Sequence, residues 1–220
     1  MNILAVETSS TVCSVAISTN GELASLAESH IPNAHDTMLV SLVQHVLFQA
    51  KLDVAQLETV AFSAGPGSFT GLRIGASFVK GLCNTHSPRL MVIPTIDAIV
   101  AASIEVALRA RCSGILGVIP SHRDLFYTQE FSFVQGEVQP CHELALLPKQ
   151  NVQRMVREDT LVVGPGALLI DQNAVSGLAR LSSRFVVKAA LQKIQSGTVN
   201  WTAPQAFEPL YHQEFEKRTT

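Results

Sequence analysis

A glycine-rich motif is the part of the sequence best suited to chemistry. Gly65-Pro66-Gly67-Ser68-Phe69-Thr70-Gly71 follows the apolar run 59–64 and precedes an amphipathic segment that extends through Leu82. A glycine-rich turn from a strand into a helix leaves free backbone N–H groups at the helix N-terminus, where the helix dipole attracts anions. The spacing fits no P-loop, because no Gly-Lys-Ser/Thr follows. It fits no dinucleotide-binding fingerprint either, because Thr70 stands where the third glycine belongs.

The same glycines also have a purely structural interpretation. Gly67, Gly71 and Gly75 repeat every four residues and therefore share one face of a helix. Without side chains there, another backbone segment can approach the helix closely. The sequence gives about equal weight to an anion-binding loop and to close packing.

A second polar group lies at the end of the first predicted strand. Glu7-Thr8-Ser9-Ser10 places a carboxylate and hydroxyls just before a hairpin. Alone, this group is more typical of an ordinary polar strand end than of a phosphate-and-metal site. Its occurrence in one structural unit with the glycine motif predicts a candidate nucleotide- or phosphate-binding site made of Glu7, Thr8, Ser9, Gly65, Gly67, Ser68 and Thr70.

The remaining reactive residue types lack the spacing that catalysis needs. The seven histidines include no His-x-x-x-His or His-Glu-x-x-His pair, so a helical zinc site is not expected. Ser9, Ser63 and Ser68 lack the Gly-x-Ser-x-Gly context of a nucleophile. We therefore predict no catalytic residue and no metal ligand in this chain.

Hydrophobic periodicity predicts the elements that position these groups. In the first half they are strands over 2–8, 12–18 and 22–29, a helix over 35–50, a strand over 59–64, a helix ending at 82, a strand over 90–93 and a helix over 95–108. The order is βββαβα. Asn20-Gly21 between the second and third strands is typical of a tight hairpin turn.

The second half resembles a reduced copy of the first. Strands are predicted over 114–119, over 125–133 and near Val138, with helices near 167–178 and 185–194. Between them, Leu161-Val162-Val163-Gly164-Pro165-Gly166 repeats the strand and Gly-Pro-Gly of the first half. We predict a duplicated α/β fold. An N-terminal lobe would span 1–108 and a reduced C-terminal lobe 109–220, with the last segment packing back on the first lobe.

Charge is scarce and unevenly distributed. Only 15% of the 220 residues are charged and the net charge is −2, whereas globular domains contain roughly 25% charged residues. Residues 1–88 hold 3 basic and 6 acidic residues, and the remainder holds 13 and 12. The surface of the first lobe should therefore be apolar or weakly polar, which indicates a protein partner.

Composition also excludes several classes of protein. A hydrophobic fraction of 47% excludes a disordered chain, and a net charge of −2 without a basic run argues against strong nucleic-acid binding by this chain alone. No segment is long and apolar enough to span a membrane, and no secretory signal is visible. Four widely spaced cysteines, Cys13, Cys83, Cys112 and Cys141, indicate reduced thiols and a cytoplasmic location.

Two motifs together carry a family resemblance. Ile3-Leu4-Ala5-Val6-Glu7-Thr8-Ser9-Ser10 and the string from Ser63 to Gly75 closely resemble the bacterial TsaB family, also called YeaZ. The resemblance is strong over about residues 1–105 and consists of scattered matches beyond. It implies the actin/Hsp70/sugar-kinase fold, which is ribonuclease H-like, with two related lobes of which the second is reduced.

The resemblance also implies a function. The family is the non-catalytic partner, and paralogue, of the TsaD/Kae1-type transferase that makes threonylcarbamoyladenosine beside the tRNA anticodon. The metal-binding histidine pair of the catalytic paralogue aligns with Thr95 and Ile99 here. ATP and a metal ion are therefore expected on the TsaD-type subunit, and no cofactor on this chain. A TsaE-type ATPase subunit is a further expected partner, and tRNA is expected only through the complex. An exposed apolar face would encourage a homodimer when the partner is absent.

By the same resemblance, the heterodimer forms through the helices over 35–50 and 70–82. Both are poor in charge, which fits an apolar surface shared between the core and a partner. The remaining positions of 35–50 are mostly the neutral Ser41, Gln44, His45 and Gln49, and we expect this face to be an interface. The expected interface residues are His35, Leu39, Leu42, Val43, Val46, Arg73, Ile74, Ser77 and Phe78.

Three positions depart from the family pattern. Glu7 replaces the usual Asp, Pro120-Ser121-His122 replaces Asp-Ala-Arg, and Tyr211-His212-Gln213 replaces the terminal Tyr-Leu-Arg. They weaken the prediction of nucleotide binding by the chain alone. Two alternatives remain: a phosphotransferase of the same fold that uses Glu7 and the glycine motif, and a peptidase, for which the sequence offers no metal pair or nucleophile.

Overall fold

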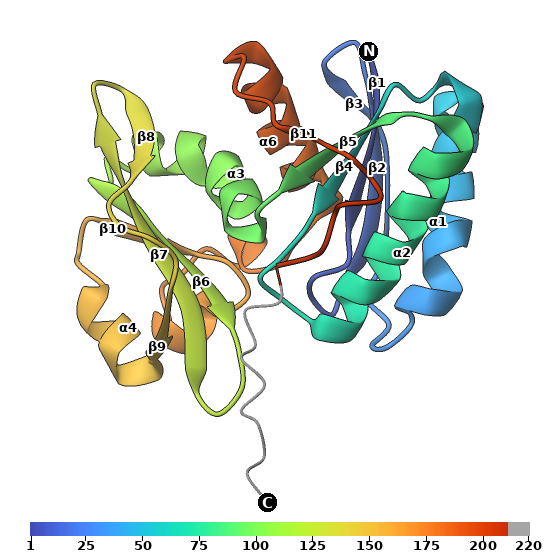
Figure 1. Ribbon diagram of the computed structural model, residues 1–220. Helices are drawn as coiled ribbons and strands as arrows, with labels where there is room; N and C mark the ends of the chain where they lie inside the picture. Colours follow the sequence, from blue (N-terminus) through green and yellow to red (C-terminus); the bar gives the residue numbers. More distant parts are fainter. Residues whose placement is uncertain (211–220) are drawn as a thin grey trace, which may run out of the picture.

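The computed structural model describes residues 1–210, which form two lobes, each built on one β-sheet (Figure 1). The first sheet has six strands in the order β11-β5-β4-β1-β2-β3. They are β1 (Asn2–Glu7), β2 (Cys13–Thr19), β3 (Glu22–Ser29), β4 (Thr59–Ser63), β5 (Arg89–Ile93) and β11 (Trp201–Thr202). β4 lies parallel to β1 and to β5, while β2 and β3 form an antiparallel meander with β1.

Helices cover both faces of this sheet. On the outer face lie α1 (His35–Ala50) and α2 (Phe69–His86), and between the two sheets lie α3 (Thr95–Arg109) and α6 (Ser183–Gln195) (Figure 1). The bounds of α1 are those predicted from its apolar periodicity, because Leu39, Leu42, Val43 and Val46 repeat at helical spacing.

The second sheet repeats the first in shorter form. Its strands are β6 (Gly114–Pro120), β7 (Leu125–Val134), β8 (Glu137–Pro140), β9 (Ala145–Pro148) and β10 (Thr160–Val163). The order β10-β6-β7-β8 corresponds to β4-β1-β2-β3, and β10 is parallel to β6 as β4 is to β1. The predicted duplication is therefore confirmed.

The second lobe differs from the prediction in detail. The single helix expected near 167–178 is instead the short α5 (Ala167–Ile170) and a 3-10 turn, η2 (Ser176–Leu178), because the intervening Asp171-Gln172-Asn173 segment forms turns. Four elements were not predicted: the strands β9 and β11, the helix α4 (Lys149–Met155) and, in the first lobe, the 3-10 turn η1 (Val54–Gln56).

The lobes share one hydrophobic core. Apolar side chains of α3 and α6 pack against the inner face of the first sheet and against the second sheet, with Ile3, Ile99, Ile115 and Val186 all buried in one cluster. A second cluster fills the space beneath α1 and α2. No helix within residues 1–210 is both long and apolar enough to cross a membrane. All four cysteines carry free thiols.

The segment that follows α6 returns to the first lobe. β11 pairs antiparallel with β5, and the Arg89 guanidinium lies 3.8 Å from the centre of the Trp201 ring. Phe207 is buried against Phe62, with ring centres 5.7 Å apart, and the Leu210 N–H donates to the Ala64 carbonyl at 2.8 Å. Residues 201–210 thus form part of the first lobe, and the divergent Tyr211-His212-Gln213 lies outside the described residues.

Candidate functional site

The glycine motif packs directly against the turn between β1 and β2. A Cβ atom at Gly71 would lie 2.0 Å from the Thr8 carbonyl oxygen, and one at Gly67 would lie 2.3 Å from the Ser9 carbonyl oxygen. The Ser68 N–H donates to that Ser9 oxygen at 2.6 Å. The three glycines therefore face other backbone segments or buried side chains. This is the geometry that the close-packing interpretation of the glycine motif predicts. At Gly67 and Gly71 the contact with the turn leaves no room for a side chain.

Glu7 lies buried beneath this contact. Its side chain is 1% exposed, and its Oε1 accepts hydrogen bonds from the Ser9 N–H at 2.5 Å and the Ser9 hydroxyl at 2.6 Å. Burial raises the pKa of Glu7 above its ordinary value, and hydrogen bonds from Ser63 and Ser9 only partly oppose the shift. The carboxyl group is thus engaged within the lobe, where it connects β1 to the turn that supports α2.

Thr95 extends this network to the start of α3. Its hydroxyl lies 2.9 Å from the Ser63 hydroxyl and 3.4 Å from that of Ser9, and it accepts from the Gly65 N–H at 3.1 Å. Ile99, one turn later, is fully buried in the shared core. The two positions that align with the paralogue's histidines therefore hold a buried, hydrogen-bonded hydroxyl and a core aliphatic side chain.

A cavity of about 490 Å³ opens beside the turn, between the two lobes. Ser9, Gly67, Ser68 and Thr70 line it, as expected for the predicted nucleotide- or phosphate-binding group. Glu7, Thr8 and Gly65 do not line it: Glu7 and Thr8 are buried, and the Gly65 N–H bonds to Thr95. Asn33, Asp36, Pro120 and Pro165 also line the cavity, and sequence reasoning missed them because they come from three separate regions of the chain: the start of α1, the end of β6 and the loop after β10.

The charge of this cavity is unfavourable for a polyphosphate. Among the described residues that line it, Asp36 is the only Asp, Glu, Lys or Arg. Asp36 accepts a hydrogen bond from the Thr37 N–H at 2.9 Å and so already interacts with the N-terminus of α1. Within residues 1–210, no group of three or more His, Cys, Asp or Glu side chains could hold a metal ion.

The structure corrects the expected interface on α1. The five residues predicted there, His35, Leu39, Leu42, Val43 and Val46, are all buried inside the first lobe. The four apolar ones belong to the core cluster beneath the helix. Their stripe faces the lobe's own sheet and cannot contact a partner while the lobe is folded.

The opposite face of α1 is exposed and nearly uncharged. Val40 and Phe48 are 50% and 78% exposed, and the other exposed positions after Asp36 are Thr37, Ser41, Gln44, His45 and Gln49. We call Val40, Ser41, Gln44 and Phe48 the outer face of α1. An exposed Phe and Val on a helix face without carboxylate or ammonium groups is typical of a surface that binds protein.

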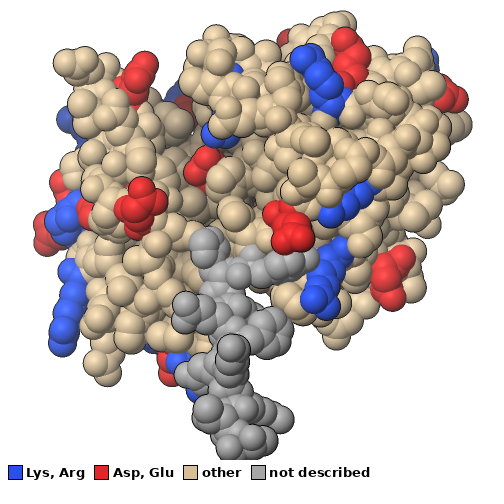
Figure 2. Space-filling view, in the orientation of Figure 1, with Lys and Arg blue, Asp and Glu red and all other residues tan. Residues whose placement is uncertain are grey.

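On α2, the expected interface residues lie at or near the surface. Arg73 and Ser77 are exposed, and Ile74 and Phe78 are half-buried. The Arg73 guanidinium lies 4.0 Å from the centre of the Phe69 ring. In the view of Figure 2 charged side chains are scattered and do not form one large patch.

Three features define the structural class of this protein: two sheets of matching strand order, a shared helical core and a cleft at the β1–β2 turn. The protein has the two-lobed α/β fold of the actin/Hsp70/sugar-kinase type, with a reduced second lobe.

Sequence comparisons identify the family to which the chain belongs. The family model described as "TsaD: tRNA N6-adenosine threonylcarbamoyltransferase" matches residues 29–160. The chain is 31% identical over 227 residues to the tRNA threonylcarbamoyladenosine biosynthesis protein TsaB of Haemophilus influenzae, covering 96% of this chain and 93% of that protein. It is 35% identical over 82 residues to the TsaB of Escherichia coli, covering 37% of this chain and 35% of that protein. The chain belongs to the TsaB family.

Solved structures agree on the fold. A protein from Pseudomonas aeruginosa described as similar to "peptidase YEAZ", and YeaZ from the same organism, superpose with TM-scores of 0.80 and 0.78. Both are 21% identical, over 96% of this chain and 99% of theirs. At this identity the likeness concerns the fold alone.

Proposed function

We propose that this protein takes part in the synthesis of threonylcarbamoyladenosine in tRNA as a non-catalytic subunit that binds and activates a TsaD-type threonylcarbamoyl transferase. The observation that carries the proposal is the 31% identity to a TsaB protein along nearly the whole chain. ATP, the metal ion and most tRNA contacts would then belong to the catalytic subunit, and the complex would work in the cytoplasm. A TsaE-type ATPase would act on the assembled complex.

The buried network supports a scaffolding role for the first lobe. The side chains of Glu7, Ser9 and Thr95, which a nucleotide-using relative would direct at its ligands, are hydrogen-bonded to one another or to neighbouring backbone. These contacts fix the β1–β2 turn, and the turn fixes α2 through the glycine contacts. A rigid α1–α2 surface is what a subunit needs if it is to hold a partner in one conformation.

The outer face of α1 is the proposed centre of the interface. It presents Phe48 and Val40 among neutral side chains, and Arg73 and Ser77 are exposed on α2, which packs against α1. Large aromatic side chains at the centre of an interface contribute much of the binding energy. The buried stripe of α1 contributes indirectly, because it holds the helix on the sheet.

Depletion of the protein followed by mass spectrometry of tRNA nucleosides tests the proposal. Threonylcarbamoyladenosine should fall and should return when the protein is supplied again. In a reconstituted reaction, the purified chain alone should not turn over ATP, whereas adding it to the TsaD-type enzyme should raise modification. Unchanged tRNA modification on depletion would overturn the pathway assignment. ATP turnover by the chain alone would favour the phosphotransferase alternative.

A further inference from the structure

A second, smaller cavity lies on the other side of the β1–β2 turn. Its volume is about 300 Å³, and Ser10, Thr11 and Pro165 line both it and the larger cavity. His30 from the end of β3 and Arg180 from the loop before α6 complete its polar lining. It is therefore built from both lobes, by residues far apart in the sequence.

The two cavities have opposite charge. Among the described residues that line the smaller one, Arg180 is the only Asp, Glu, Lys or Arg, whereas the larger one has only Asp36. Arg180 is exposed and makes no hydrogen bond or ion pair within the described residues 1–210. A guanidinium presents a planar fork of donors that matches the oxygen atoms of a carboxylate or a phosphate.

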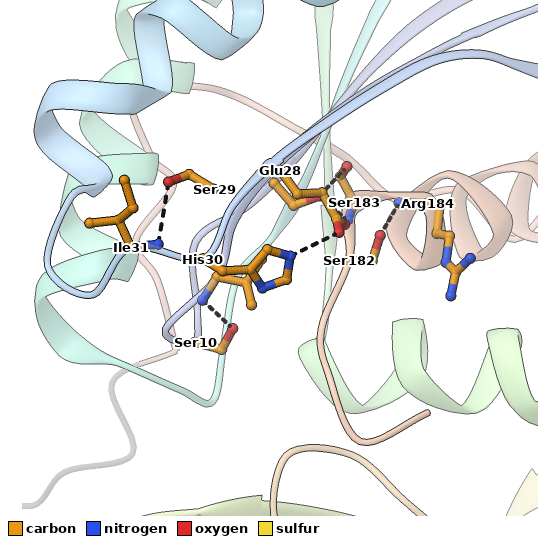
Figure 3. Close-up of polar contacts among 10 residues, drawn as sticks. Ser10, Glu28, Ser29, His30, Ile31, Ser182, Ser183 and Arg184 are labelled. Atoms are coloured by element: carbon orange, nitrogen blue, oxygen red, sulfur yellow. Dashed lines mark hydrogen bonds and ion pairs between the residues drawn. The ribbon is translucent and has the colours of Figure 1, made fainter. Parts of the chain in front are cut away.

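The neighbouring polar groups are suited to the same kind of ligand. The Ser10 hydroxyl oxygen accepts from the Val12 N–H at 3.1 Å, which leaves its own hydrogen free to donate. The His30 Nε2 lies 3.6 Å from a carboxylate oxygen of Glu28, and its Nδ1 has no partner in the described part of the chain (Figure 3). Glu28 does not line the cavity.

The surrounding contacts hold these groups in place. The Ser14 hydroxyl donates to Glu28 at 2.9 Å and lies 2.7 Å from the Ser183 hydroxyl, while the Ser183 N–H donates to Ser14 at 2.9 Å (Figure 3). These bonds connect β2 and β3 to the start of α6, three residues after Arg180. The loop that bears Arg180 is thus anchored to the first lobe.

We propose that this smaller cavity binds a small oxyanion, the carboxylate or phosphate group of a metabolite, through Arg180, His30, Ser10 and Thr11. The site is independent of the proposed interface on α1 and of the proposed function. Because its residues come from both lobes, the bound anion stabilises the arrangement of the lobes as well as the folded state.

Titration of the full-length protein with inorganic phosphate and, separately, with acetate tests the site, at constant ionic strength maintained with chloride. Amide NMR shifts of Ser10, Thr11 and Arg180 should saturate with one of the two anions. Saturation by phosphate assigns a phosphate-bearing ligand, and saturation by acetate alone assigns a carboxylate. Either result supports the site.

Two arginine variants provide a matched pair. Arg180→Gln should weaken anion binding about tenfold or more, because it removes a charge-assisted hydrogen bond. Arg184→Gln removes an equally exposed arginine four residues away whose guanidinium lies 5.1 Å from the centre of the Phe185 ring and not in the cavity. It should leave the affinity within about twofold. Equal losses in both variants, or no saturable binding of either anion, would overturn the proposal.

Discussion

The two Gly-Pro-Gly loops occupy equivalent places in the two lobes, yet they lead to different structures. Gly65-Pro66-Gly67 follows β4 and precedes α2, a helix of 18 residues. Gly164-Pro165-Gly166 follows β10 and precedes α5, which has only 4 residues. Gly65 and Gly164 share a positive φ of 107° and 100°, but the peptide bond to the following proline is cis after Gly65 and not after Gly164, so the two turns share the conformation of their first glycine only.

The difference lies in what the helix after each loop touches. In the first lobe, the missing side chains of Gly67 and Gly71 admit backbone carbonyl groups of the β1–β2 turn. In the second, a Cβ atom at Gly166 would meet the buried Val118 and Phe126 side chains at 2.7 and 3.0 Å, and a Cβ atom at Gly164 would lie 2.5 Å from the Val118 carbonyl oxygen. The first lobe has therefore kept a rigid contact that orients a long helix, and the second lobe has kept the Gly-Pro-Gly loop without the long helix. This contrast is expected if the first lobe presents the surface on which function depends.

Alanine substitutions at glycines should reveal the largest difference in stability between the two loops. Gly71→Ala forces a Cβ atom to within 2.0 Å of the Thr8 oxygen and should lower the free energy of unfolding by about 3 kcal/mol. Gly166→Ala should cost less, about 1 kcal/mol, because the added methyl group meets side chains and not a backbone carbonyl group. Gly81→Ala, on the same helix as Gly71 but with no atom within 4 Å, should stabilise by about 0.5 kcal/mol. Urea denaturation measures all three, and equal costs at Gly71 and Gly166 would contradict the contrast.

Buried threonines offer a second comparison. Thr95 in the first-lobe network contacts Ser63, Ser9 and the Gly65 N–H, whereas Thr128 in the second lobe donates one hydrogen bond to the Gly117 carbonyl at 3.1 Å. Thr95→Val should cost about 2 kcal/mol and Thr128→Val about 1 kcal/mol, because unpaired buried polar groups remain. Chemical denaturation measures the difference. A smaller loss at Thr95 would show that the network does not stabilise the first lobe.

Because the pKa of Glu7 is raised in the folded protein, the free energy of unfolding should depend on pH. The folded protein keeps the Glu7 proton at pH values where the unfolded chain, with a pKa near 4.5, has lost it. The free energy of unfolding of the wild type should therefore fall as pH rises above about 4.5, until the folded pKa is passed. Glu7→Gln removes this dependence, so its stability relative to the wild type should increase with pH.

Exposed Glu22 provides the control for this titration. Glu22→Gln should follow the wild-type pH profile in chemical denaturation, because its side chain is solvated. If the Glu7→Gln profile also runs parallel to the wild type between pH 4 and 8, the buried carboxyl group is not the source of the dependence.

The sequence predicts the first lobe better than the second for physical reasons. A long amphipathic stripe and an Asn-Gly turn are local signals, so α1 and β3 were predicted with their observed bounds. β9 and α4 are short, and their positions depend on packing against β7. The four-residue spacing of Gly67, Gly71 and Gly75 predicted a shared face, but only the structure shows which backbone occupies it.

The functional surfaces depend still more on the fold. Periodicity identified the apolar stripe of α1 but could not tell whether the stripe faces the lobe's own sheet or a partner. The lack of charge at Ser41, Gln44, His45 and Gln49 indicated the opposite face from the sequence, but Val40 and Phe48 were not among the predicted interface residues because they are only two apolar residues among neutral ones. No local pattern joins His30 to Arg180, since the two lie 150 positions apart and meet only at the boundary between the lobes.

The central claim is that the first lobe, through the outer face of α1, binds the catalytic subunit. Its most direct test is the affinity of the TsaD-type enzyme for Phe48→Glu, measured by calorimetry beside Leu169→Glu. The latter alters a 53% exposed residue of the second lobe. Phe48→Glu should weaken binding about 100-fold with an unchanged melting temperature, because a charge replaces a central aromatic side chain, and Leu169→Glu should bind like the wild type. Wild-type affinity for Phe48→Glu, or a loss confined to Leu169→Glu, would contradict the account.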